Sequence, residues 1–105
     1  MSTLAELARI RAEHGLAPAD GTIWLGIGFR PLKANAIEID PARLPSESEC
    51  AAVAGLDVVL LFPGDLIRYG QLRTLSDRLY RARPRRLLLV DSDHKRTAYL
   101  KLAKP

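Results

Sequence analysis

The most constraining feature of this sequence is a helical segment that lies between two short and almost wholly apolar runs. The runs are DVVLLF at 57–62 and RRLLLV at 85–90, and the helical segment is 71–82. The apolar stripe of that segment consists of Leu72, Leu75, Leu79 and Ala82. Short apolar runs bounded by turn residues are typical of strands buried on both faces of a sheet. The order strand, helix, strand therefore predicts a central β-α-β unit with two parallel strands.

A capping box predicts a helix near the start of the chain. Thr3 and Glu6 have the T-x-x-E spacing in which each side chain accepts a backbone N–H at the helix start. The apolar residues of 4–14 recur mainly on one side, and Gly15 supplies a left-handed end. We expect a helix over 4–14. It packs either on the rest of the chain or, as a peripheral element, on a partner.

A second capping box predicts a short helix in the middle of the chain. Ser46 and Glu49 again show the S-x-x-E spacing, and the segment ends near Ala54 before Gly55. Cys50 falls on its small apolar face, where we interpret it as a small hydrophobic residue. A single cysteine cannot form an internal disulfide or a cysteine-based zinc site.

Two further strands are predicted in the first half of the chain. Residues 22–29 are rich in β-branched and aromatic residues, and 36–40 alternates apolar and polar side chains. We expect the two strands to form a hairpin across 30–35. Gly26 and Gly28 recur on one face of the first strand, which indicates that a helix or a backbone segment packs closely there.

The C-terminal segment completes the predicted fold. Residues 97–102 alternate in the manner of a strand, which we place antiparallel at an edge of the sheet, although a helix from Lys95 is the alternative. The predicted class is therefore α/β, with mixed α+β as the alternative. We expect one domain over 1–105, in two or three layers, with about five strands.

Composition limits the classes of protein to which the chain can belong. Hydrophobic residues make up 48% and charged residues 27% of the 105 positions, as in soluble globular proteins. The apolar runs are far shorter than a membrane span, and the N-terminus lacks the apolar core of a signal peptide. We therefore expect a cytoplasmic protein that does not bind membranes.

An acidic turn gives the sequence its candidate for metal chemistry. Asp91, Asp93 and His94 follow the second strand of the β-α-β unit, and Asp65 follows the first. Ligands of open α/β sheets bind outside the carboxyl ends of the strands, and carboxylates are ligands that Mg²⁺ prefers. Asp65, Asp91 and Asp93 are therefore candidate magnesium ligands, with His94 as a candidate for proton transfer. The alternatives are a structural turn, since Asp and Ser favour turns, and a loop that binds a partner.

Positive charge is concentrated in the second half of the chain. Residues 65–105 hold eleven Lys or Arg and four Asp or Glu, whereas 1–64 hold five and eight. Clustered arginines bind phosphates, although GC-rich coding also favours arginine over lysine. The candidate anion or nucleic-acid ligands, which have no carboxylate nearby in the sequence, are Arg78, Arg83, Arg85 and Arg86.

Three functional hypotheses follow from these features. The first is a small interaction module or accessory subunit that is not an enzyme and binds a protein partner or a second copy of itself. The second is a protein that binds the backbone of nucleic acids through the basic half. The third is a magnesium-dependent phosphate or nucleotide enzyme that uses Asp91 and Asp93.

Overall fold

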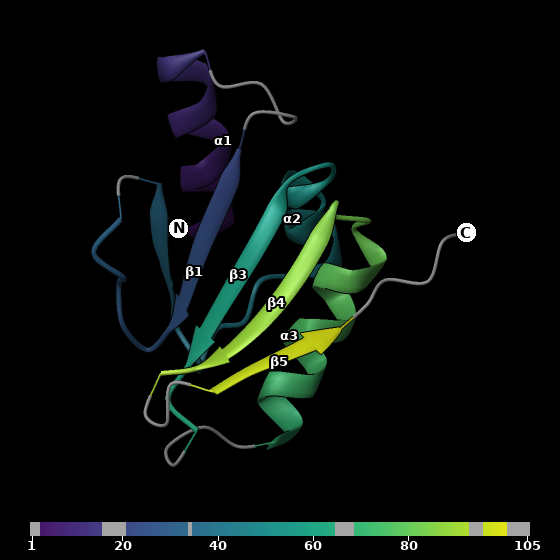
Figure 1. Cartoon of the computed structure of the whole chain (residues 1–105). Helices are drawn as coiled ribbons and strands as arrows, with labels where there is room; N and C mark the ends of the chain where they lie inside the picture. Colours follow the sequence, from purple (N-terminus) through teal and green to yellow (C-terminus); the bar gives the residue numbers. More distant parts are fainter. Residues whose placement is uncertain (1–2, 16–20, 34, 65–68, 93–95, 101–105) are drawn as a thin grey trace.

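The fold combines helices with a mainly parallel sheet (Figure 1). The structure is a computed structural model, which describes residues 3–15, 21–33, 35–64, 69–92 and 96–100. In chain order the elements are α1 (Thr3–His14), β1 (Thr22–Ile27), β2 (Ala36–Ile39), α2 (Glu47–Cys50), the 3₁₀ turn η2 (Ala51–Val53), β3 (Asp57–Phe62), α3 (Tyr69–Arg81), β4 (Arg86–Asp91) and β5 (Arg96–Leu100).

The strands lie in the order β2-β1-β3-β4-β5. The first four are parallel, and β5 runs antiparallel to β4. The expected class, a mixed α/β fold with parallel central strands, is confirmed. The β-α-β unit is confirmed with it, since β3 and β4 pair in parallel from Asp57 opposite Arg86 to Phe62 opposite Asp91 and are joined by α3.

The predicted hairpin between the first two strands is wrong, because β1 and β2 are parallel. Parallel neighbours usually need a crossover of a dozen or more residues. Here eight residues, 28–35, suffice because β2 has only four residues and begins opposite Trp24. The chain therefore returns only about 10 Å along the strand direction, and eight extended residues reach more than twice as far.

The directions of the crossovers explain why α2 and α3 share one face of the sheet. The connections from β2 to β3 and from β3 to β4 advance in the same direction across the sheet. Right-handed crossovers in one direction place α2 and α3 on the same face. The connection from β1 to β2 advances in the opposite direction, and it contains a loop in place of a helix. In Figure 1 all three helices lie behind the sheet.

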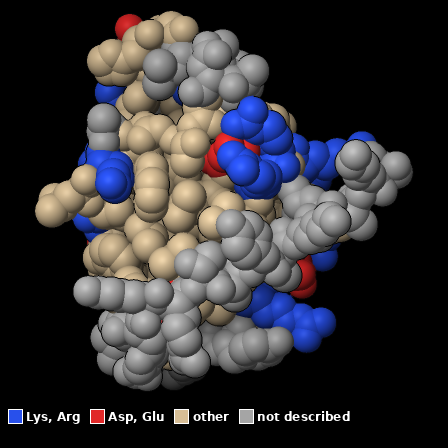
Figure 2. Space-filling view, viewed as in Figure 1, with Lys and Arg blue, Asp and Glu red and all other residues tan. Residues whose placement is uncertain are grey.

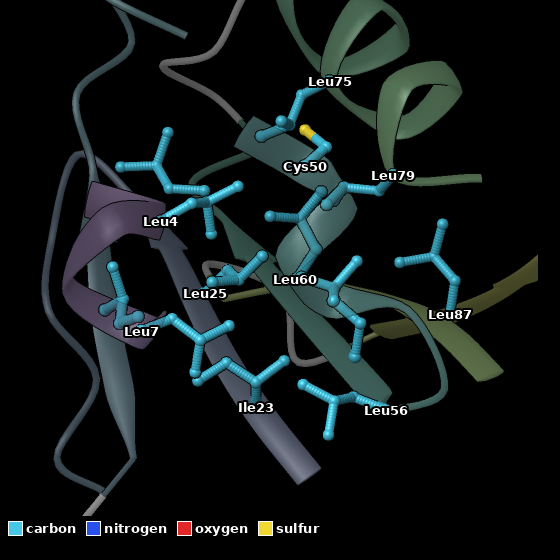
Figure 3. Close-up of a cluster of buried hydrophobic side chains, with 14 of the residues drawn as sticks. Leu4, Leu7, Ile23, Leu25, Cys50, Leu56, Leu60, Leu75, Leu79 and Leu87 are labelled. Atoms are coloured by element: carbon cyan, nitrogen blue, oxygen red, sulfur yellow. The ribbon is translucent and has the colours of Figure 1, made fainter. Parts of the chain in front are cut away.

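The hydrophobic core lies between this helical layer and the sheet (Figure 3). Leu4 and Leu7 of α1 are 1% and 2% exposed, so the N-terminal helix packs on the rest of the chain. Leu75 and Leu79 of α3 are fully buried, as their spacing predicts, and Cys50 is buried with them. The sheet contributes alternate residues of each strand, namely Ile23, Leu25, Ile27, Ile37, Ile39, Val58, Leu60, Leu87 and Leu89.

Local signals in the sequence fix the ends of several elements. Ser46 accepts the N–H of Glu49, and the Glu49 carboxylate accepts the N–H of Ser46, so the second capping box is confirmed. The side chains of Thr3 and Glu6 lie outside the described part of the chain. Gly15 and Gly55 follow helical segments with φ of +62° and +76°, the left-handed conformation that glycine adopts without strain.

The expectation that both strands of the β-α-β unit are buried on both faces is wrong for β4. Its residues alternate between a buried side, with Leu87 and Leu89, and a more exposed side, with Leu88 and Val90. The alternation arises because helices cover one face only. Within the described residues, no helix is long and apolar enough to span a membrane.

Candidate docking surface

The face of the sheet opposite the helices carries a cluster of apolar side chains. These side chains, which we call the open face, are Trp24 of β1, Val59 and Leu61 of β3, and Leu88 and Val90 of β4. Val59 is 8% exposed and the other four are half-buried. In Figure 2 the part of this face drawn in tan is a broad area without Lys, Arg, Asp or Glu, and lysine or arginine lies at its border. Apolar patches without a covering element mark interaction surfaces.

A loop crosses the open face at Gly26. A Cβ on Gly26 would overlap the carbonyl oxygen of Phe29 and would lie 2.7 Å from Cδ of Pro31. From Gly26 and Gly28 we expected a helix or a backbone segment to pack closely on this strand. At Gly26 a backbone segment does so. Gly28 serves a different purpose, because it has φ of +81° and open space around it.

The same loop extends the apolar surface beyond the strands. Leu32 is 99% exposed, and the ammonium of Lys33 lies 5.0 Å from the ring centroid of Trp24. A cation at this distance is attracted to the face of an indole ring. The side-chain amide of Asn35 donates to the carbonyl of Thr22, which ties the end of the loop to the start of β1. The loop therefore presents a leucine and a lysine at the border of the open face.

A buried carboxylate with two arginines borders the open face at the amino ends of β3 and β4. Asp57 accepts from Nε and Nη2 of Arg85 at 2.7 and 2.5 Å. It also accepts from Nε and Nη2 of Arg86 at 3.3 and 2.7 Å. The Asp57 side chain is 5% exposed, whereas those of Arg85 and Arg86 are 55% and 66% exposed. We call these three residues the arginine cluster.

Ionisation in the arginine cluster is set by the contacts between Asp57 and the two guanidiniums. Hydrogen bonds from Arg85 and then Arg86 hold the pKa of Asp57 far below its usual value, although burial acts in the opposite direction. Asp57 in turn raises the pKa of Arg85 through hydrogen bonding and charge. The carboxylate is thus ionised at neutral pH, and two guanidiniums share one negative charge.

The structure corrects one premise about the four arginines. Arg85 and Arg86 have a carboxylate partner, which comes from the start of the neighbouring strand. Arg78 lies apart from them, and its Nη1 donates to the carbonyl of Pro45 at 2.7 Å. Arg83 is exposed and has φ of 57°, and its carbonyl accepts the N–H of Gly55. Of the predicted anion ligands, only Arg85 and Arg86 share a partner.

The acidic turn is described only in part. Asp91 is 9% exposed at the end of β4, and its Oδ1 accepts the N–H of Gly64 at 3.2 Å. A Cβ on Gly64 would lie 2.6 Å from Cγ of Asp91, so the two loops meet closely at this edge. Asp65, Asp93 and His94 lie outside the described residues. Among the residues that are described, no group of three metal-ligating side chains occurs.

Comparisons with protein-family models, curated proteins and solved structures give no match to this chain. The inference of function therefore depends on the geometry of the described residues.

Two parts of this surface were missed by the sequence analysis, although the sequence contains signals for both. If the runs DVVLLF and RLLLVD are aligned as parallel neighbours, Asp57 falls opposite Arg86, as it does in the structure. The segment 28–35, with Pro31 inside it, is too short for a turn, a helix and a second turn. A sheet that lacks one crossover helix leaves part of one face without cover.

Proposed function

We propose that this chain is a small interaction module that docks a protein surface on its open face. The observation that supports the proposal is the one-sided placement of the helices. No helix in the described part of the chain lies above Trp24, Val59, Leu61, Leu88 and Val90. Sheet faces of this kind become buried when they pack on another layer of secondary structure. The charged border fits the same role, since interfaces combine an apolar centre with a polar rim.

The proposal is tested by a lysine substitution at the centre of the open face. Leu88→Lys introduces a charge where the proposed partner would exclude water, and Thr74→Lys, at an exposed position of α3, is the matched control. Sedimentation equilibrium of the purified chains measures self-association, and co-purification of tagged chains from the native host measures association with other proteins. We expect Leu88→Lys to abolish an association that the wild type and Thr74→Lys retain. Identical behaviour of all three chains in both measurements would contradict the proposal.

A second candidate function is binding to the backbone of single-stranded nucleic acid. The supporting observation is that an aromatic side chain, Trp24, and the exposed guanidiniums of Arg85 and Arg86 occur on the same face of the sheet. Bases stack on aromatic rings, and guanidiniums bind phosphates. The apolar centre favours a protein partner over this alternative, because Val59, Leu61, Leu88 and Val90 offer neither stacking planes nor positive charge.

Salt dependence tests the second candidate. We expect an oligonucleotide, if it binds, to lose affinity steeply with salt, and Arg85→Gln to reduce the slope of log K against log salt by about 1. Arg73→Gln on α3, where the arginine lies 4.0 Å from Asp77, is the control. Binding of a fluorescent 20-mer is measured by anisotropy at several salt concentrations. No binding at low salt, or equal slopes for both variants, would exclude this function.

A further inference from the structure

We infer that the segment of the partner that covers the open face is an amphipathic α-helix. This inference rests on the proposed function and specifies what the partner places on the same surface. It follows from the topology of the sheet, from the dimensions of the apolar area and from the charge at its border.

The topology shows which element the open face lacks. Sheets of parallel strands usually have crossover helices on both faces. A right-handed crossover from β1 to β2 places its connecting segment on the open face, because it advances opposite to the crossovers that contain α2 and α3. That segment is the loop 28–35, which contacts Gly26 in the same row as Leu61 of the open face. The open face therefore receives a loop where such folds usually have a helix.

The described apolar area has the dimensions of one helix. The loop bounds this area on β1, and the apolar side chains lie on β1, β3 and β4. These three strands span two strand spacings, or about 10 Å, which is the diameter of a helix with its side chains. The six residues of β3 extend about 20 Å, the length of about 13 helical residues. On the opposite face of the sheet, α3 has 13 residues (Figure 1).

The side chains of the open face favour a helix over an extended segment. Val59 lies between Trp24 and Leu88 in one row, and Leu61 lies beside Val90 in another. Apart from the indole N–H, these side chains have no hydrogen-bonding groups. An extended segment laid across them would bury unpaired backbone N–H and C=O groups, whereas a helix pairs these groups internally. A helix with apolar residues at i, i+3, i+4 and i+7 would present a matching stripe.

Lys33 defines the charge of one flank of this helix. Its side chain is exposed, and its ammonium lies 5.0 Å from the ring centroid of Trp24 at the border of the open face. A helix on the open face passes beside this ammonium, so a carboxylate on that flank would pair with it. Opposite charges at the rim of an interface select the partner, since like charges there oppose binding. The helix therefore combines an apolar stripe with acidic residues on the flank beside β1.

Selection from a random peptide library tests this inference. Peptides long enough for several helical turns are selected on the purified wild type, on Leu88→Lys and on Thr74→Lys, the control at an exposed position of α3. Sequencing gives the spacing of apolar residues in peptides that the wild type enriches and Leu88→Lys does not. Circular dichroism of synthesised peptides measures helix formation on binding. The fluorescence of Trp24, the single tryptophan of the chain, reports coverage of the open face.

We expect the apolar residues of the enriched peptides to recur at i, i+3, i+4 and i+7. The peptides should become helical on binding, because short isolated helices are marginal in water. Their affinity should fall by roughly tenfold or more for Leu88→Lys and should stay the same for Thr74→Lys. Selection on Lys33→Glu should replace the acidic residues of the flank by basic residues.

Three outcomes would contradict this account. Enriched peptides whose apolar residues alternate, or follow no period, would overturn the helix and leave the proposed function in place. The same flank charge in peptides selected on the wild type and on Lys33→Glu would overturn the assignment of the acidic flank. Peptides that bind the wild type and Leu88→Lys equally would show that the open face does not dock them, and would overturn both the helix and the proposed function.

Discussion

Removing the charge of Asp57 should destabilise the fold in a manner that depends on pH. Asp57→Asn keeps the shape of the side chain but turns an amide toward two guanidiniums. In the wild type these guanidiniums donate four hydrogen bonds to the carboxylate, at 2.5 to 3.3 Å. An amide N–H cannot accept these bonds, and its partial positive charge opposes them. The substituted side chain remains buried, so its amide N–H is left without an acceptor, whereas the exposed guanidiniums can bond to water.

The magnitude follows from the exposure of the three side chains. Hydrogen bonds to a charged group contribute about 1.5–3 kcal/mol where water is excluded. Arg85 and Arg86 are more than half exposed, and solvent screens their part of the interaction. We therefore expect a net loss of about 2 kcal/mol, which for a domain of this size lowers Tm by about 8–16 °C.

The dependence on pH has a definite sign. The pKa of Asp57 lies far below its usual value in the folded chain, so the unfolded chain takes up this proton first as the pH falls. The stabilisation is complete above the unfolded pKa of about 4 and is lost below it. The difference in Tm between wild type and Asp57→Asn should be constant above pH 5 and should narrow below pH 4.

Thermal unfolding followed by circular dichroism from pH 2.5 to 7 measures both effects. Asp77→Asn is the matched control, because Asp77 is 55% exposed and lies 4.0 Å from a single arginine. Its Tm should stay within about 3 °C of the wild type at every pH. A difference for Asp57→Asn that stays constant down to pH 2.5, or one no larger than that of the control, would refute the reasoning.

Two further outcomes are expected. Gly26→Ala should lower the free energy of unfolding by roughly 1–3 kcal/mol, because its Cβ would meet Phe29 and Pro31. Gly70→Ala in α3, where there is open space around the glycine, should raise the free energy of unfolding by roughly 0.5–1 kcal/mol. Urea titration measures both, and a Gly26→Ala chain as stable as the wild type would show that the loop does not press on β1. Burial raises the pKa of the Cys50 thiol to about 11, although the charge of Arg78 acts to lower this pKa. A thiol reagent at pH 7.5 should therefore modify Cys50 only when the chain unfolds. Rapid modification in the native state would contradict that burial.

The sequence predicts those elements whose signals are local. The stripe of α3 and the capping box of Ser46 and Glu49 depend on residues within one or two helical turns of each other. Parallel pairing of β3 with β4 follows from the local order of strand, helix and strand. The pairing of β1 with β2 was mispredicted because the length of the connection suggested a hairpin. The contact that decides this pairing is the packing of the loop on Gly26. It depends on how the chain crosses from the end of β1 to the start of β2.

The candidate surface was harder to predict because its parts are distant in the sequence. Asp57 and Arg85 are 28 residues apart, and only the register of two strands brings them together. Leu88 and Val90 belong to a run that suits a strand buried on both faces. Whether such a run is covered on one face or two depends on the connection between β1 and β2, which contributes no residue to β4.

The central claim is that the open face contacts another protein surface. For a partner that is a second copy of this chain, it is tested most directly by intermolecular nuclear Overhauser effects. A sample that mixes isotope-labelled and unlabelled chains reports only contacts between copies. We predict cross-peaks from the methyl groups of Val59, Leu61 and Leu88 to the indole or methyl protons of the unlabelled copy. Cross-peaks confined to the helical layer, at residues such as Tyr80, would show that the chain associates through its other face and would contradict the account.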